Sequence, residues 1–220
     1  MAEERNRREE LESLAATIEK CRKCPLWRNT HHAVPGEGNV NARLMLIGEA
    51  PGEQEDLTGR PFVGRAGRLL NNLLEGIGLT RQEVFIGNVV KHRPPKNRDP
   101  RGCEIEICSP YLDRQIEVIC PDLLVTLGRH SSRYILSKVP LEFERITEIR
   151  GRVIDAEIYR RPMRIIPSLH PAAGLYSPSY RKNLEEDFQI IKRELKSPRA
   201  SSGDPEDDQP CRESDPTVPS

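Results

Sequence analysis

The sequence predicts one α/β domain built around a mostly parallel sheet. Four short apolar runs have the length and continuity of strands that are buried on both faces, at residues 43–48, 84–90, 123–127 and 163–167. Segments with apolar residues at three- and four-residue spacing lie between and around these runs, as in amphipathic helices. Such alternation is typical of βαβ units with helices on both faces of the sheet.

The helices are predicted from this spacing in chain order. The first places Leu11, Leu14 and Ile18 on one face, among many Glu and Arg residues. The second carries Leu69, Leu70 and further apolar residues between the first two strands. We expect the helices at residues 4–20, 67–78, 103–119, 129–136 and 179–195.

The composition of the chain predicts where the folded domain ends. The chain has 220 residues with 34 basic and 34 acidic side chains, so its formal net charge is zero. Residues 197–220 hold six acids against two bases, together with five Pro and no apolar periodicity. The preceding body is therefore positive by four charges, which is compatible with nucleic-acid binding. We expect a single domain over residues 1–196 and a disordered acidic tail over 197–220.

Several classes of protein are excluded by the pattern of apolar residues. No apolar run approaches the roughly 18 residues that span a bilayer. The first twelve residues are highly charged and lack the apolar core of a signal peptide. We therefore expect a cytoplasmic, nucleoid-associated protein. Its six Cys are then expected to be metal ligands or buried thiols before disulfides.

A Cys-x-x-Cys pair follows the first predicted helix. Cys21 and Cys24 have the spacing that lets two thiolates bind one centre, whether zinc, an iron–sulfur cluster or a redox pair. Further candidate ligands are His92, Cys103, Cys108 and Cys120, of which Cys120, after an apolar helix and before a Pro, is better interpreted as a buried thiol. Cys103 and Cys108 are five residues apart on one helix, about 140° apart in direction, so only one of them is expected to face the centre. Spacing alone leaves the choice open.

Polar and glycine-rich motifs follow the predicted strands. Glu49 lies in the turn 48–56, whose acids also have a simpler interpretation as helix caps. Phe62 is framed by three Gly and two Arg within residues 59–67. Asn88 and His170 end the second and the last strand. Ligands bind beyond the carboxyl ends of strands in such sheets, so these side chains are expected to share one site.

Together, these motifs resemble one known family. GEAPGEQED, GRPFVGRAG, NVVKHRPPKNRDP and HPAA occur in order, after a Cys-x-x-Cys pair, and the set is similar to the family 4 uracil-DNA glycosylases of bacteria and archaea. The resemblance covers roughly residues 10–195. It implies a three-layer α/β/α sandwich around a four-stranded parallel sheet, a [4Fe–4S] cluster, and removal of uracil from DNA in base excision repair.

The resemblance also implies roles for individual residues. Glu49 matches the carboxylate that positions water and stabilises charge, and His170 matches the His near uracil O2. Phe62 matches the aromatic that stacks on the flipped base, and Asn88 the side chain that binds its N3 and O4 edge. The main chain at Gly48 and Ala50 is expected to contact the substrate.

The implied cluster ligands are Cys21, Cys24, position 92 and Cys108. The family's usual residue at position 92 is Cys, whereas this chain has His92. We expect His92 to be the fourth ligand, because imidazole replaces thiolate on iron in Rieske centres. The alternatives are that Cys103 takes this place, or that three ligands hold a labile cluster.

Uracil-containing DNA is the expected partner of a monomeric chain, without membrane association. Phosphate contacts are expected from Arg65, Lys91, Arg93, Arg98 and Arg181, and a wedge in the base stack from Leu175 or Tyr176. Three other functions stay open: a glycosylase of broader damaged-base specificity, a non-catalytic iron–sulfur DNA-binding module, and a zinc-bound structural protein.

Overall fold

The computed structural model describes residues 2–197, so the predicted tail lies outside the described residues except for Ser197. Six strands form one mixed sheet in the order β1-β3-β2-β4-β6-β5. The four inner strands are parallel, and the two edge strands run antiparallel to their neighbours. The strands are β1 (Glu37–Gly38), β2 (Leu44–Gly48), β3 (Phe85–Asn88), β4 (Leu123–Leu127), β5 (Ile154–Ile158) and β6 (Arg161–Ser168).

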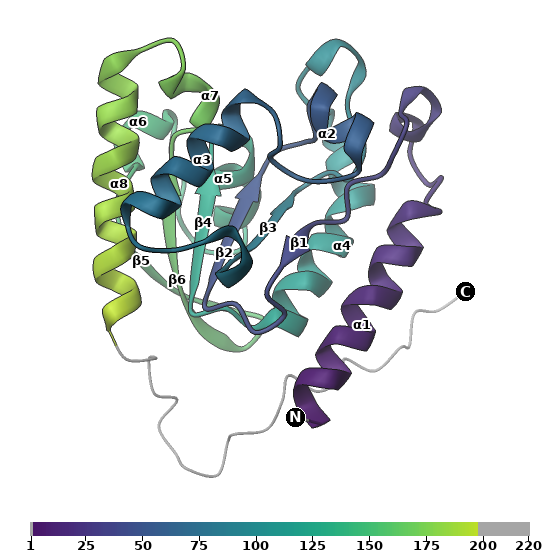
Figure 1. Cartoon of the computed structure of the whole chain (residues 1–220), viewed down its shortest axis with the longest axis horizontal. Helices are drawn as coiled ribbons and strands as arrows, with labels where there is room; N and C mark the ends of the chain where they lie inside the picture. Colours follow the sequence, from purple (N-terminus) through teal and green to yellow (C-terminus); the bar gives the residue numbers. More distant parts are fainter. Residues whose placement is uncertain (1, 198–220) are drawn as a thin grey trace.

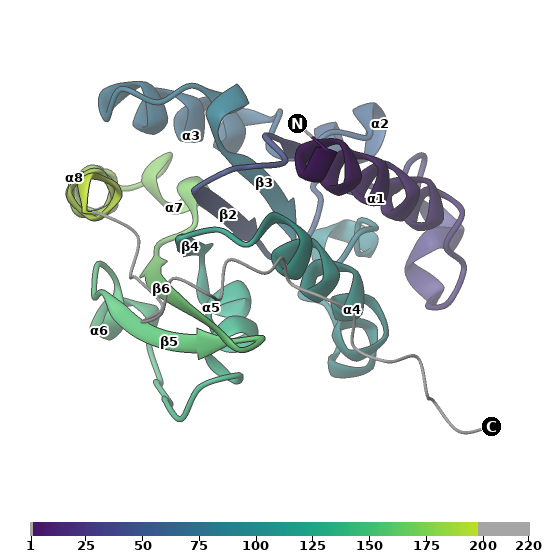
Figure 2. The same cartoon turned by 90° about the horizontal axis from the view of Figure 1, so that it is seen from below.

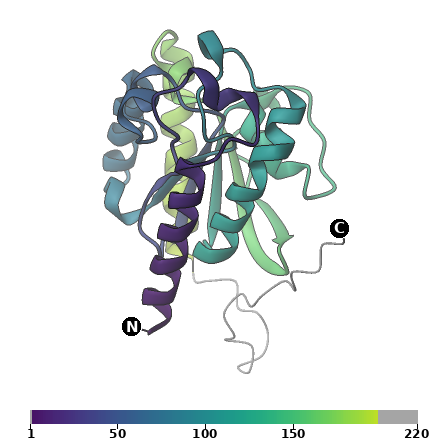
Figure 3. The same cartoon turned by 90° about the vertical axis from the view of Figure 1, so that its right-hand side faces the viewer.

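Helices cover both faces of this sheet, as expected for a three-layer arrangement (Figures 1 and 2). The face with α3 and α8 opposes the face with α1 and α4, and α1 lies alongside α4 (Figure 3). The α-helices are α1 (Ala2–Glu19), α2 (Glu53–Thr58), α3 (Arg65–Gly76), α4 (Gly102–Ile119), α5 (Arg129–Leu136), α6 (Ile146–Ile149), α7 (Pro171–Gly174) and α8 (Pro178–Lys196). Short 3-10 turns are η1 (Pro25–Asn29), η2 (Arg81–Glu83) and η3 (Pro95–Asn97).

Strand β2 shows how the sequence builds two cores. Met45 and Ile47 pack toward α1, α4 and α5, whereas Leu44 and Leu46 pack toward α3 and α8. All four side chains are buried, because successive side chains in a strand point to opposite faces. A continuous apolar run is therefore the pattern that a strand covered on both sides requires.

The predicted four-stranded parallel sheet is correct for the inner strands and wrong for the whole sheet. The edge strand β1 has two residues and lies outside the four apolar runs that predict strands. The other edge strand, β5, forms a hairpin with β6 through Tyr159 and Arg160, both at positive φ. Such two-residue turns usually carry Asn-Gly or Asp-Gly, so the sequence lacked the usual signal for this hairpin.

No helix among residues 2–197 is long and apolar enough to cross a membrane.

At most helix ends, the predicted boundary differs from the observed one by one or two residues. This difference is within the usual uncertainty of helix termini.

Candidate active site

A cavity of about 390 Å³ opens at the carboxyl ends of the parallel strands. Glu49 follows β2, Asn88 ends β3 and His170 follows β6, and all three side chains line this cavity together with Phe62 and Ala50. Its size is within the range of small-molecule sites. The structure thus brings together the four side chains that the motifs singled out, from the ends of three parallel strands and from one glycine-rich loop.

Asn88 presents an unpaired oxygen to this site. The residue is 1% exposed, and its Oδ1 is buried without a hydrogen-bond partner in the protein. A buried amide oxygen without a donor is costly, so it is typical of a site whose donor comes from a ligand. The main chain of Asn88 is held by pairing with Gly48 and by Lys91, whose Nζ donates to the Asn88 carbonyl at 2.9 Å.

Gly48 is required by the close approach of two side chains. A Cβ at this position would lie 2.3 Å from Asn88 Oδ1 and 2.7 Å from the ring of Phe62. Real Cβ atoms do not come this close to other atoms, so only glycine lets both side chains pack over the end of β2. Glycine at position 48 therefore allows the predicted base-binding pair to lie over the same main-chain position.

Phe62 is held in an uncommon conformation by its neighbours. Its φ is 50°, in the left-handed region, and its carbonyl accepts a hydrogen bond from Arg81 Nη1 at 3.0 Å. The same carbonyl lies against Gly67, where a Cβ would be 1.8 Å away. The Phe62 ring lies 5.6 Å from the ring of His170, centroid to centroid. The loop therefore fixes a flat apolar surface beside Asn88.

Glu55 explains part of the acidic character of the 48–56 turn. Its Oε1 accepts from the amides of Val63 and Gly64 at 2.8 Å each, and its Oε2 accepts from the amide of Gly52 at 3.1 Å. One carboxylate thus ties the turn after β2 to the Phe62 loop. The interpretation of these acids as caps is correct for Glu55, whereas Glu49 faces the cavity.

His170 is arranged as a neutral hydrogen-bond donor. Its Nδ1 accepts from the amide of Ala172 at 3.2 Å, so the ring proton is on Nε2. Burial lowers the pKa of the His170 imidazole to about 4, against a smaller opposing effect of the Glu55 charge. At neutral pH the residue therefore offers an N–H group and carries no charge.

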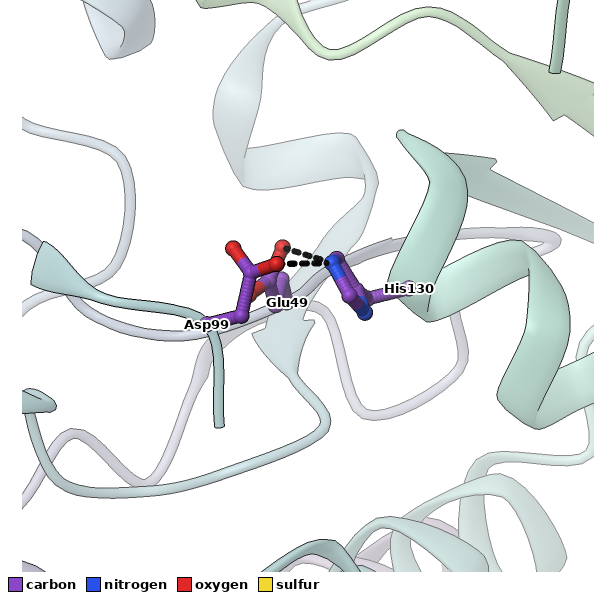
Figure 4. Close-up of side chains that lie close together, drawn as sticks. All are labelled: Glu49, Asp99 and His130. Carbon is purple, nitrogen blue, oxygen red and sulfur yellow. Dashed lines mark ion pairs between the residues drawn. The ribbon is translucent and has the colours of Figure 1, made fainter. Parts of the chain in front are cut away.

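Glu49 lies close to two ionisable side chains, Asp99 and His130, that the sequence motifs do not indicate. His130 Nε2 lies 4.0 Å from Glu49 Oε2 and 3.0 Å from Asp99 Oδ2 (Figure 4). Burial raises the pKa of the Glu49 carboxyl, and His130 opposes this rise. The position of His130 after strand β4, at the same edge of the sheet, could have indicated that it belongs to the site. A His on a short helix, taken alone, does not indicate this.

The cysteine pair approaches α4 and the loop after β3. Tyr111 donates from its hydroxyl to Cys21 Sγ at 3.3 Å, and the Lys91 amide donates to Cys108 Sγ at 3.2 Å. Burial raises the pKa of the Cys108 thiol to about 11, and the charges of Cys24 and Cys21 add to this rise. Cys24 and Cys108 are buried, whereas Cys103 is exposed.

His92 is also buried, at 3% exposure. Within residues 2–197, the only three Cys, His or carboxylate ligand atoms that lie within 4.8 Å of one another belong to Glu49, Asp99 and His130.

The predicted DNA contacts lie in different environments. Tyr176 is 77% exposed, and the guanidinium of Arg65 lies over its ring at 5.7 Å. Leu175 packs in part against the core, and Arg93 lies 3.7 Å from Glu53. The assignment of Lys91 to phosphate is wrong, because this side chain is 1% exposed and bonds inside the protein. For a basic residue next to a strand end, the sequence does not distinguish a buried side chain from one that is exposed to DNA.

Residues 35–196 of this α/β protein match the uracil DNA glycosylase superfamily. A type-4 uracil-DNA glycosylase of Saccharolobus solfataricus is 52% identical over 85% of this chain and 87% of its own length. A type-4 uracil-DNA glycosylase of Thermotoga maritima is 41% identical over 86% of this chain and 97% of its own length. A type-5 uracil-DNA glycosylase of Pyrobaculum aerophilum is 30% identical over 83% of this chain and 84% of its own length. This chain belongs to the type-4 uracil-DNA glycosylases.

Proposed function

We propose that this chain hydrolyses the N-glycosidic bond of uracil in DNA and leaves an abasic site, using the cavity lined by Glu49, Phe62, Asn88 and His170. The observation that carries the proposal is the buried, unpaired Oδ1 of Asn88 beside the Phe62 ring. This pair suits a flat base with a hydrogen-bond donor on its edge. The target nucleotide must leave the base stack to reach the cavity.

Base choice follows from the chemistry of this edge. Uracil presents N3–H, which donates to Asn88 Oδ1, and O4, which accepts from the amide nitrogen of Asn88. Cytosine has an acceptor at N3 and a donor at C4, so both groups would face like partners. A site built for hydrogen bonding rejects such a mismatch strongly, because its buried polar groups stay unpaired.

Bond breaking places charge on both sides of the glycosidic bond. Negative charge develops on uracil O2, and the neutral His170 donates Nε2–H to it. Positive charge develops on the sugar, which the Glu49 carboxylate stabilises while it orients the attacking water. Ala50, Pro51 and Gly52 of the turn after β2 line the same cavity.

DNA contacts are proposed for the rim of the cavity. Tyr176 is the better wedge of the two candidates, because it is exposed and Leu175 packs against the core. Arg65 and Arg93 are proposed to contact phosphates, which gives affinity without sequence preference. Among the remaining basic residues, Arg98 binds both oxygens of Glu104, so its guanidinium is already paired.

The type-4 family implies a [4Fe–4S] cluster, and the donor set of this chain fits one. Cys21, Cys24 and Cys108 supply three thiols, and the buried His92 is proposed as the fourth ligand before the exposed Cys103. A bound cluster would cross-link the segment after α1, the loop after β3 and helix α4. Hydrolysis of the N-glycosidic bond involves no net oxidation or reduction, so we propose a structural role for the cluster.

The proposed activity is tested by base release. The full chain, purified without oxygen, is incubated with a labelled oligonucleotide that carries one uracil, and abasic sites are cleaved with alkali. We expect strand breaks at uracil and none at thymine or cytosine in matched oligonucleotides. Tight DNA binding without breaks, in protein that retains its visible absorbance, would instead support a non-catalytic DNA-binding module. Equal release of hypoxanthine would indicate a broader specificity.

A further inference from the structure

Three ionisable side chains from three different elements meet at the edge of the cavity. Glu49 follows β2, Asp99 lies in the loop after β3, and His130 lies in the first turn of α5 (Figure 4). His130 Nε2 is 3.0 Å from Asp99 Oδ2 and 4.0 Å from Glu49 Oε2. An N–H group on Nε2 donates to Asp99, whereas a bare Nε2 accepts from Arg129 Nη2, which lies 3.1 Å away. His130 Nε2 therefore lies among two carboxylates and one guanidinium.

Asp99 has a defined position although its side chain is 64% exposed. The preceding Arg98 binds both oxygens of the buried Glu104 at 2.7 and 2.8 Å. The amide of Arg101 donates to the same carboxylate at 2.7 Å. Two anchors thus flank Asp99 in the chain and hold its carboxylate against His130.

The charged groups around Glu49 act on its pKa in both directions. Burial raises the pKa of Glu49, Asp99 raises it further, and His130 and Arg129 lower it. Arg129 Nη2 also lies 3.4 Å from Asp99 Oδ2 and 3.1 Å from His130 Nε2. Among the described residues, these are the charged groups that face Glu49. His130 is the nearest group that favours its ionised form.

We propose that His130, held by Asp99, is a positioning residue that keeps the Glu49 carboxylate ionised and directed into the cavity. This inference rests on the proposed function, because it assigns Glu49 to the charge that develops on the sugar. A role of His130 in binding phosphate is disfavoured by the geometry. Two carboxylates lie 3.0 and 4.0 Å from His130 Nε2 and would repel an incoming phosphate, against the attraction of one guanidinium, that of Arg129.

The test is the pH dependence of uracil release under single-turnover conditions with saturating enzyme, between pH 5 and pH 9. Wild type is compared with His130→Ala and His130→Gln. Arg133→Ala, on the exposed side of the same helix, is the control for loss of one residue from α5. Thermal melting and visible absorbance establish that each variant is folded and retains its metal centre.

We expect His130→Ala to release uracil about 10- to 100-fold more slowly at pH 7, the size of effect that misplacing a reacting group produces. Its acid limb should move to higher pH, because Glu49 loses the group that favours its charge. His130→Gln keeps a donor at a similar reach and should recover part of the rate. The Kd of His130→Ala for uracil-containing DNA should stay within about twofold of wild type. In Arg133→Ala, both the release rate and this Kd should stay within the same range.

Three results would overturn the inference. In the first, His130→Ala keeps the wild-type rate and acid limb while wild type releases uracil. In the second, it weakens DNA binding and changes its salt dependence without changing the rate at saturation, which would make His130 a DNA contact. In the third, wild type loses activity in EDTA and regains it with Mg²⁺, which would make the three side chains a cation site. Absence of uracil release by wild type would instead remove the proposed function.

Discussion

The buried ammonium group of Lys91 donates to the main-chain carbonyl of Asn88 at 2.9 Å. Its second acceptor is Gln115 Oε1 at 2.7 Å, and the Lys91 amide donates to Cys108 Sγ at 3.2 Å. One residue thus connects the main chain of Asn88, whose side chain is proposed to bind the base, with a cysteine proposed to hold the cluster. The cavity and the cysteine site are therefore parts of one hydrogen-bonded unit.

Replacing Lys91 by Met should weaken this unit. The Met side chain fills similar space but leaves the Asn88 carbonyl and Gln115 Oε1 without their donor. Loss of buried hydrogen bonds to a charged group costs about 1–3 kcal/mol. We expect a lower midpoint of urea unfolding and slower uracil release, with Lys182→Met on the exposed side of α8 as the control. An unchanged midpoint in Lys91→Met would contradict this role.

Gly48→Ala should block the base-binding pair without removing any functional group. The new Cβ would lie 2.3 Å from Asn88 Oδ1 and 2.7 Å from the Phe62 ring, so both side chains must move. Displacement by about 1 Å costs on the order of 100-fold in rate. Gly76→Ala is the control, because no atom lies within 4 Å of its added Cβ. Wild-type release rates in Gly48→Ala would show that this packing is unimportant.

The Glu49 carboxylate should set the acid side of the pH profile. Burial raises its pKa above the ordinary value of about 4.3, so the reactive ionised form is lost at a higher pH than for an exposed Glu. We expect uracil release to fall as pH drops through this raised pKa. Glu49→Gln should be slow and lack this limb, whereas the exposed Glu53→Gln should match wild type. Full turnover by Glu49→Gln would exclude the assigned role.

The fourth cluster ligand is identified by iron content. His92 is buried next to Lys91, and Cys103 is exposed on the first turn of α4. We expect His92→Ala to lose iron and visible absorbance after anaerobic purification, while Cys103→Ala keeps both. The reverse pattern would assign the fourth position to Cys103. Similar retention in both variants would indicate a cluster held by three cysteines.

The sequence predicted the inner strands and the four side chains that line the cavity, because continuous apolar runs and the motifs at their ends are local patterns. It did not predict edge strand β5, since the turn at Tyr159 and Arg160 lacks the residues that mark such hairpins. His130 and Asp99 were missed because their relation to Glu49 exists only between elements. Lys91 was misassigned for the same reason, as its burial depends on the packing of α4.

The central claim is that Asn88 selects uracil through its buried oxygen, and single-turnover uracil release by Asn88→Ala tests it most directly. The matched control is Asn72→Ala, which removes the same group from the exposed face of α3. We predict that Asn88→Ala binds uracil-containing DNA as wild type does but releases the base at least about 100-fold more slowly, and that Asn72→Ala behaves as wild type. Equal release rates in Asn88→Ala and wild type would contradict the claim.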